Sequence, residues 1–187
     1  MRTLVLMVSA FFLSSCGTMT KNYFEDSTPE LVLEDFFEGE TRAWGVFEDR
    51  FGNLRAQFTV DIKGTWEDQT LTLEEDFIYA SGRKDRRVWA ISKQSDGRYE
   101  GRAEDVVGVA TGRAAGNAFN WSYVMNLPVG NRTFRVRFND WLWLQESGVM
   151  INRARVTKFG VEIGQISIFF LKGDDQGVSR AGNGEAS

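Results

Sequence analysis

Two carboxylates interrupt otherwise apolar faces of expected strands, and these are the residues best placed to do chemistry. Glu75 alternates with apolar residues along one segment, and Asp140 does so along another. The two apolar series are Leu71, Leu73, Phe77 and Tyr79, and Phe134, Val136, Phe138, Leu142 and Leu144. Successive side chains of a strand point to opposite faces, so each carboxylate shares the apolar face. A buried carboxylate is costly unless it is paired, and we expect a cationic partner.

The late arginines Arg153 and Arg155 are the expected partners. They share one face of a strand, although periodicity alone does not say whether that face is inside. Three interpretations stay open. The carboxylates could form a structural ion pair or be turned outward by a bulge. An arginine could hold a fatty-acid carboxylate as a bidentate pair at the bottom of an apolar pocket. Glu75 and Asp140 could instead act as general acid and base, as in a glycosidase.

If Asp140 is buried and paired, replacing it by Ala should leave a cation without a partner. The expected cost is about 3–5 kcal/mol of stability.

Cys16 ends a segment with the composition of a secretory signal. Arg2 precedes an apolar run from Leu4 to Leu13 that is too short to span a bilayer, and two serines then lead to the cysteine. This ending resembles the bacterial lipobox, in which the cysteine is acylated, for example with palmitate, and becomes the new N-terminus. The resemblance implies cleavage after residue 15 and a lipid anchor at Cys16. Gly17, in place of an Asp, favours the periplasmic face of the outer membrane.

The composition excludes several kinds of chemistry. The chain has no His and a single Cys, so Ser-His pairs, Cys-His pairs and ordinary zinc sites are not expected. The formal net charge is −4, and the Lys and Arg residues are scattered, so nucleic acid is not an expected partner. We expect no cofactor and no metal.

A period of two dominates the chain from Gly39 to residue 172. Apolar residues from Leu54 to Ile62 alternate with polar residues, as in a strand with one dry face and one wet face. Turn residues separate further segments of this kind. The expected strands are 41–50, 54–63, 66–80, 86–95, 97–105, 116–127, 132–145, 148–158 and 161–172. The glycine-containing stretch 106–115 is expected to be a wider turn.

These patterns predict an all-β fold, a single antiparallel up-and-down β-barrel of about 8–10 strands. Closure removes the two open edges of a meander. The outward positions Arg55, Asp61 and Lys63 are charged, which argues against a barrel that faces lipid. Residues 30–37 are expected to form a short helix or plug. The predicted organisation is a signal peptide at 1–15, a lipidated linker at 16–29, the barrel at 30–172 and a disordered tail at 173–187.

Short motifs along residues 30–172 resemble the DUF3833 family of bacterial lipoproteins. The matching stretches are Leu73-Glu74-Glu75-Asp76-Phe77, Arg87-Val88-Trp89, Asp105-Val106-Val107-Gly108, Gly116-Asn117-Ala118, Asp140-Trp141, Asn152-Arg153-Ala154 and Lys158-Phe159-Gly160. Gly39 and Trp44, taken with the late arginines, are similar to the lipocalin arrangement. That likeness implies that an arginine from a late strand covers Trp44 at one barrel end. The gene neighbourhoods of the family imply a link to the modification of membrane fatty acids.

Trp141 and Trp143 alternate with Asp140 and should therefore face outward, beside Arg135 and Arg137. Exposed indoles near cations suit a membrane surface or a protein partner. The alternative is that segment 30–37 packs over them.

The leading hypothesis is a lipid-anchored barrel that binds a fatty acyl chain or a similar amphiphile and is not an enzyme. The candidate ligand-binding residues are Arg153, Arg155, Asp140, Glu75 and Trp44. One alternative is an enzyme that acts on lipid through its buried carboxylates, or a subunit that supports such an enzyme. The other is an envelope lipoprotein with a solid barrel that docks a protein partner.

Overall fold

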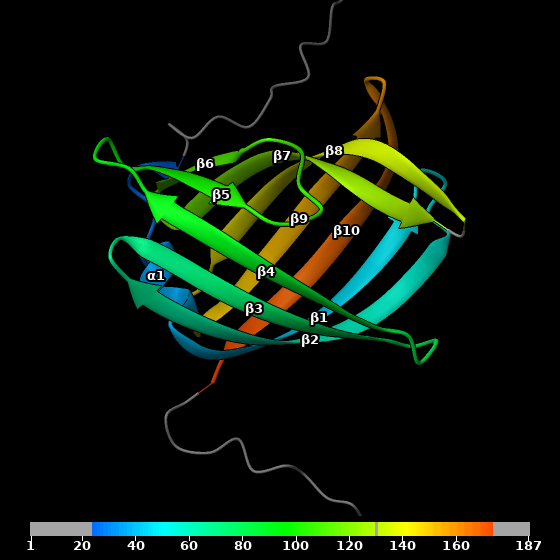
Figure 1. Ribbon diagram of the computed structural model, residues 1–187. Coiled ribbons are helices and arrows are strands. Elements are labelled where there is room, and N and C mark those ends of the chain that lie inside the picture. The colour runs from blue at the N-terminus through cyan, green and yellow to red at the C-terminus, as the bar shows by residue number, and fades with distance from the viewer. Residues whose placement is uncertain (1–23, 130, 174–187) are drawn as a thin grey trace, which may run out of the picture.

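Ten antiparallel strands and one short helix make up the computed structural model, which describes residues 24–129 and 131–173. The helix α1 spans Leu33–Phe37. The strands are β1 Gly39–Asp49, β2 Leu54–Glu67, β3 Thr70–Tyr79, β4 Lys84–Lys93, β5 Arg98–Arg102, β6 Ala110–Ala115, β7 Ala118–Val129, β8 Arg132–Leu144, β9 Val149–Lys158 and β10 Val161–Lys172. Figure 1 shows the strands wrapping around a common interior.

The strands close into a barrel in sequence order, and the last pairs with the first. That closing ladder runs from Thr41 opposite Lys172 to Asp49 opposite Gly164. The predicted antiparallel up-and-down barrel is therefore confirmed. The apolar faces point inward, as the alternation of Phe58, Val60 and Ile62 on β2 indicates.

Two expectations about the strands are wrong. The expected strand 66–80 begins later, because β2 continues to Glu67 and turns at Asp68 and Gln69, which have φ of 46° and 60°. Both central residues of a type I′ hairpin need positive φ, and the usual Asn-Gly or Asp-Gly signature is missing here. The stretch 106–115 is not simply a wide turn, since its second half is strand β6.

Gly112 lies within strand β6 because aromatic rings of β7 pack closely against its backbone. A Cβ on Gly112 would lie 2.4 Å from a ring carbon of Trp121 and 2.5 Å from one of Phe119. Glycine in a strand often marks such a close approach. The large rings of β7 therefore fill the space that a side chain of β6 would take.

The backbone pairing of the barrel wall is interrupted between the first half of β4 and the segment 103–109. β4 pairs with β5 over Ala90–Lys93 only. The segment 103–109 instead follows β7, where the amide of Val107 donates to the carbonyl of Val124 at 2.8 Å and that of Asn126 donates to Asp105 at 2.8 Å. Among the described residues, the first half of β4 therefore faces this segment through side chains.

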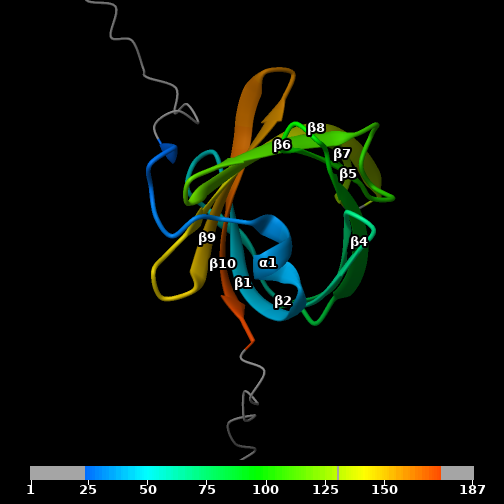
Figure 2. The ribbon, with the colours of Figure 1, turned by 90° about the vertical axis from the view of Figure 1, so that its left-hand side faces the viewer.

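The helix α1 closes one end of the barrel, as Figure 2 shows from that end. Leu31, Leu33, Phe36 and Phe37 are buried there. Glu34 fixes the helix, because its Oε2 accepts a hydrogen bond from the Tyr99 hydroxyl at 2.8 Å and its Oε1 pairs with Lys93. The expected helix or plug at residues 30–37 is confirmed.

We expect Gly64→Ala to destabilise the barrel by about 1–3 kcal/mol through overpacking. A Cβ on Gly64 would lie 1.8 Å from the carbonyl oxygen of Phe37, so α1 would have to move. Urea unfolding measures the loss. Thr65→Ala is the control, because Thr65 is exposed on the same strand and should cost less than about 1 kcal/mol. Equal stability of the two variants would mean that α1 does not seat against β2.

Candidate ligand-binding site

The inward faces of the strands leave a cavity of about 200 Å³ inside the barrel. Aromatic and aliphatic side chains form most of its wall. Trp89 makes edge contacts with Trp121 and Tyr123 at ring separations of 5.7 Å and 5.4 Å, and Tyr123 stacks on Phe138 at 5.0 Å. Leu33 and Phe37 of α1 line the cavity, and so does Tyr79 at the end of β3. The cavity therefore extends from the helix toward the opposite end of the barrel.

Arg87 is the cation among the polar groups of this cavity. It lies directly opposite Glu75 in the β3–β4 ladder, and its Nη1 is 3.8 Å from Glu75 Oε2. Its Nε and Nη2 donate hydrogen bonds to Asp105 Oδ2 at 3.0 Å and 2.8 Å. The Glu75 side chain is 14% exposed and that of Arg87 is 25% exposed. Arg87 thus joins β3 to the segment 103–109.

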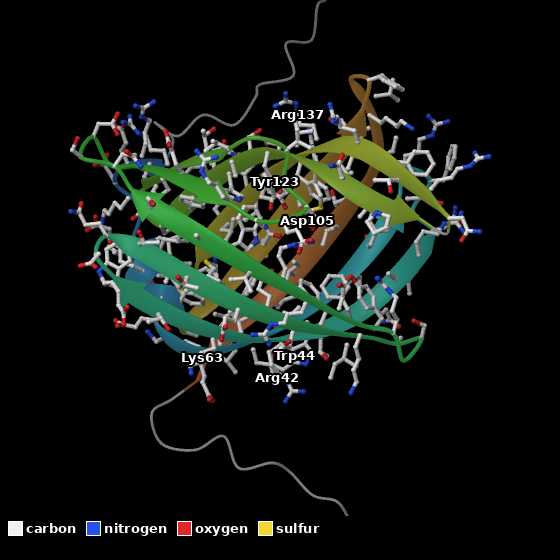
Figure 3. All side chains as sticks on the ribbon, in the orientation of Figure 1. Arg42, Trp44, Lys63, Asp105, Tyr123 and Arg137 are labelled. Carbon is white, nitrogen blue, oxygen red and sulfur yellow. The ribbon has the colours of Figure 1, made fainter. Side chains whose placement is uncertain are left out.

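Asp140 enters the cavity from β8 and is paired with a hydroxyl. The Tyr123 hydroxyl donates to Asp140 Oδ2 at 3.3 Å. In the view of Figure 3, Tyr123 and Asp105 lie over the middle of the barrel, while Arg42, Trp44 and Lys63 lie at its lower edge. The expectation that removing Asp140 leaves a directly paired cation without a partner is wrong, because the direct partner of Asp140 is Tyr123.

Burial controls the protonation of this group of residues. It raises the pKa of Asp140 to about 8, although the Tyr123 hydrogen bond and the charge of Arg87 oppose the shift. It likewise raises the pKa of Glu75 to about 7 against the opposing effect of Arg87. Burial also raises the pKa of Tyr123 well above its ordinary value. At neutral pH, Asp140 is therefore mainly protonated, and Glu75 is present in both protonation states.

Three carboxyl oxygens in or beside the cavity make no hydrogen bond with any residue that the structure describes. They are Glu75 Oε2, Asp105 Oδ1 and Asp140 Oδ1. A buried polar atom without a partner costs about 1–3 kcal/mol. Such atoms beside an apolar cavity are candidate polar contacts for a bound molecule.

Arg153 and Arg155 do not reach the cavity. Both are exposed, and Arg155 lies 3.8 Å from Glu162 on the outside of the barrel. The β8–β9 register places Ala154 opposite Asp140, so the other face of β9 is inside. That face consists of Met150, Asn152, Ala154 and Val156. The expectation that a late arginine pairs with the carboxylates or clamps a ligand is wrong.

Trp44 is also outside the barrel. It is 42% exposed, lies opposite Phe169 in the β1–β10 ladder and has Arg42 over its ring at 5.7 Å. The expected cover by an arginine of a late strand is therefore wrong. The nearby exposed apolar residues Phe169 and Ile78 extend this outer patch.

Trp141 and Trp143 face outward as expected, and they stack at 6.2 Å. The segment that packs on them is not 30–37, which enters the barrel. Phe24 instead contacts Trp141 at a ring separation of 5.5 Å. The predicted anchor Cys16 lies outside the described residues.

Comparison with known sequences decides the family. The sequence model described as "Protein of unknown function (DUF3833)" matches residues 10–172. The chain belongs to the DUF3833 family. No curated protein matches the sequence of this DUF3833 member.

A solved structure supports the fold of the DUF3833 barrel. The S-type phycobiliprotein lyase CPES from Guillardia theta is similar to it with a TM-score of 0.57 and 9% sequence identity. The match covers 77% of this chain and 92% of the lyase. At this identity the likeness concerns the fold alone.

The described part of the DUF3833 chain contains no helix that is long and apolar enough to cross a membrane. Within residues 24–129 and 131–173 there is also no group of three or more His, Cys, Asp or Glu residues arranged to hold a metal ion.

Proposed function

We propose that this DUF3833 protein is a lipid-anchored envelope protein whose barrel binds a fatty acyl chain or a similar amphiphile. The observation that carries the proposal is the largely apolar cavity whose wall contains carboxyl oxygens of Glu75 and Asp140 that make no hydrogen bond with the described residues. Ligand sites are typically apolar cavities with a few polar groups that fix the orientation of the ligand. A solid barrel that serves only as a docking protein would need no such cavity.

The size of the cavity limits what it holds. A dry cavity of about 150 Å³ accepts benzene. The 200 Å³ of this barrel therefore suits the polar head and the first carbons of an acyl chain. The rest of a long chain would extend past Tyr79, toward the end of the barrel that lies opposite α1.

The proposed anchor at Cys16 would hold the barrel close to the membrane. Phe24 contacts the outer wall at Trp141, and seven residues lie between it and Cys16, which makes eight steps from Cα to Cα. An extended chain covers at most about 3.3–3.6 Å per residue, so the tether reaches roughly 26–29 Å. The outer face of the barrel is thus kept within one protein diameter of the lipid.

Cys16→Ser should abolish acylation, because the chain has no other thiol to accept lipid. The variant should be retained in its uncleaved form and should not incorporate radiolabelled palmitate in cells. Ser15→Ala is the control and should still be acylated, since Ala is also small. A processed and acylated Cys16→Ser protein would overturn the anchor.

The binding proposal is tested with the mature chain from residue 16, carrying Ser in place of the acylated cysteine. We expect one fluorescent fatty-chain probe, supplied as the acid and as the alcohol, to bind per barrel by titration and native mass spectrometry. Ala154→Phe should abolish binding, because Ala154 lines the cavity. Ala90→Phe is the control, since Ala90 is exposed on β4. Absence of binding in the unsubstituted chain would refute the proposal.

A second candidate is acid–base catalysis on a bound lipid. It is favoured by the raised pKa values of Glu75 and Asp140, about 7 and about 8, in one apolar cavity. Glu75→Gln would then abolish turnover of a bound substrate without abolishing its binding. Loss of binding and turnover together would favour the simple binding role.

A further inference from the structure

The guanidinium of Arg87, which lines the cavity, already has carboxylate partners. Asp105 accepts hydrogen bonds from both Nε and Nη2 of Arg87 through a single oxygen. The remaining terminal nitrogen, Nη1, lies beside Glu75. A ligand carboxylate would therefore have to displace a carboxylate of the protein to gain the bidentate pair that makes arginine a strong anion receptor.

The cavity groups that have oxygens without hydrogen-bond partners among the described residues are carboxyls. Asp140 is 9% exposed and lines the cavity, and its Oδ1 has no hydrogen-bond partner among the described residues. Glu75 also lines the cavity, and its Oε2 makes no hydrogen bond there. Glu75 is thus open to a hydrogen-bond donor, and Asp140 is open to a donor when it is ionised and to an acceptor when it is protonated.

We propose that the polar head of the bound amphiphile is a hydrogen-bond donor, a hydroxyl or an amine, and not a carboxylate. The inference rests on the proposed function, since it names the ligand class of the same cavity. A hydroxyl donates to one carboxyl oxygen and can accept from the other carboxyl when that group is protonated. An ammonium adds a second cation to a site with three carboxyl groups and one arginine.

Charge explains why the acid is rejected. An anion placed beside Glu75 and Asp140 opposes the ionisation of both carboxyls where water is largely excluded, so Glu75 would have to take up a proton at pH 7, and this disfavours binding. An ammonium has the opposite effect and stabilises the ionised carboxylates. Because burial raises the pKa of Asp140 to about 8, amine binding at pH 7 should release protons from the site.

The test compares three ligands with the same ten-carbon chain, decan-1-ol, decylamine and sodium decanoate, on the mature chain carrying Cys16→Ser. At pH 7 we expect the alcohol and the amine to bind at least about tenfold more tightly than the acid. Calorimetry in buffers of different ionisation enthalpy should show proton release for the amine only.

Substitutions test whether the preference among the three ligands arises in the cavity. Asp140→Asn should weaken decylamine by about fivefold or more and change decan-1-ol by less than about threefold, because Asn keeps the shape and removes the charge. Asp76→Asn is the control, since Asp76 is exposed on β3 beside Arg86. It should change no affinity.

Two results overturn the inference in distinguishable ways. Decanoate that binds as tightly as the alcohol and the amine refutes the donor head and leaves the binding barrel intact. If none of the three ligands binds and the fluorescent fatty-chain probe does not bind either, the proposed function is refuted. The inference about a hydrogen-bond donor in the ligand is then refuted as well.

Discussion

Replacing Arg87 by Met is expected to lower the free energy of unfolding at pH 7 by about 3–5 kcal/mol, measured by urea denaturation. The substitution keeps an unbranched side chain and removes the charge that faces Glu75 and Asp105. Those carboxylates would stay partly buried with no cation beside them. Because Glu75 can take up a proton, the loss should shrink when the same measurement is made at pH 5.

Arg86→Met is the matched control, one position earlier on β4. Arg86 is 53% exposed and pairs with Glu74 and Asp76 on the outside of the barrel. Exposed pairs contribute about 0–1 kcal/mol, so this variant should stay near the parent. Adding Glu75→Gln to Arg87→Met should restore part of the stability. Equal losses for Arg86→Met and Arg87→Met would contradict the role of Arg87 as the interior cation.

The barrel should become less stable as the pH rises from 5 to 8. The pKa of Asp140 rises from 3.8 to about 8 on folding, and that of Glu75 rises from 4.5 to about 7. Between these values the folded state binds more protons than the unfolded state, so raising the pH favours unfolding. The slope is expected to be on the order of 1 kcal/mol per pH unit. The favourable contribution is complete below pH 4 and is lost above pH 8.

Asp140→Asn should flatten this dependence, because the amide does not titrate in this range. Urea midpoints measured from pH 5 to pH 9 give the slope, and the variant should gain stability relative to the parent toward pH 9. Asp76→Asn should leave the slope unchanged, since that carboxylate is exposed. A parent profile that is flat from pH 5 to pH 8 would mean that the interior carboxyls ionise freely.

Hydrophobic alternation predicts most of this fold because the barrel has one dry face. The bounds of β8, β9 and β10 lie within about one residue of those expected, and the period of two places Glu75 and Asp140 inside. Strand β6 could not be recognised in this way, since its glycine resembles a turn residue until the rings of β7 are in place.

The sequence-based expectations did not include Arg87 as the cation of the site, although the sequence pattern contains a signal for it. Arg87 alternates with Trp89 and Ile91 and so adds a charged residue to the end of an apolar face. It also lies in a stretch that carries the family resemblance. The facing of β9 is different, because both of its faces contain polar residues and only the register with β8 places Ala154 inside and Arg153 outside. The approach of Asp105 to Arg87 depends on the path of segment 103–109, which no local pattern encodes.

The wall of the barrel is held together less strongly between β4 and segment 103–109 than between its paired strands. The paired junctions between strands open only when a ladder of backbone hydrogen bonds is broken. Beside the first half of β4, the described residues are held mainly by the bonds from Arg87 to Asp105, and a bond to a charged group contributes about 1.5–3 kcal/mol. We therefore expect any widening of the barrel to begin at this place, and we expect Arg87 to limit it.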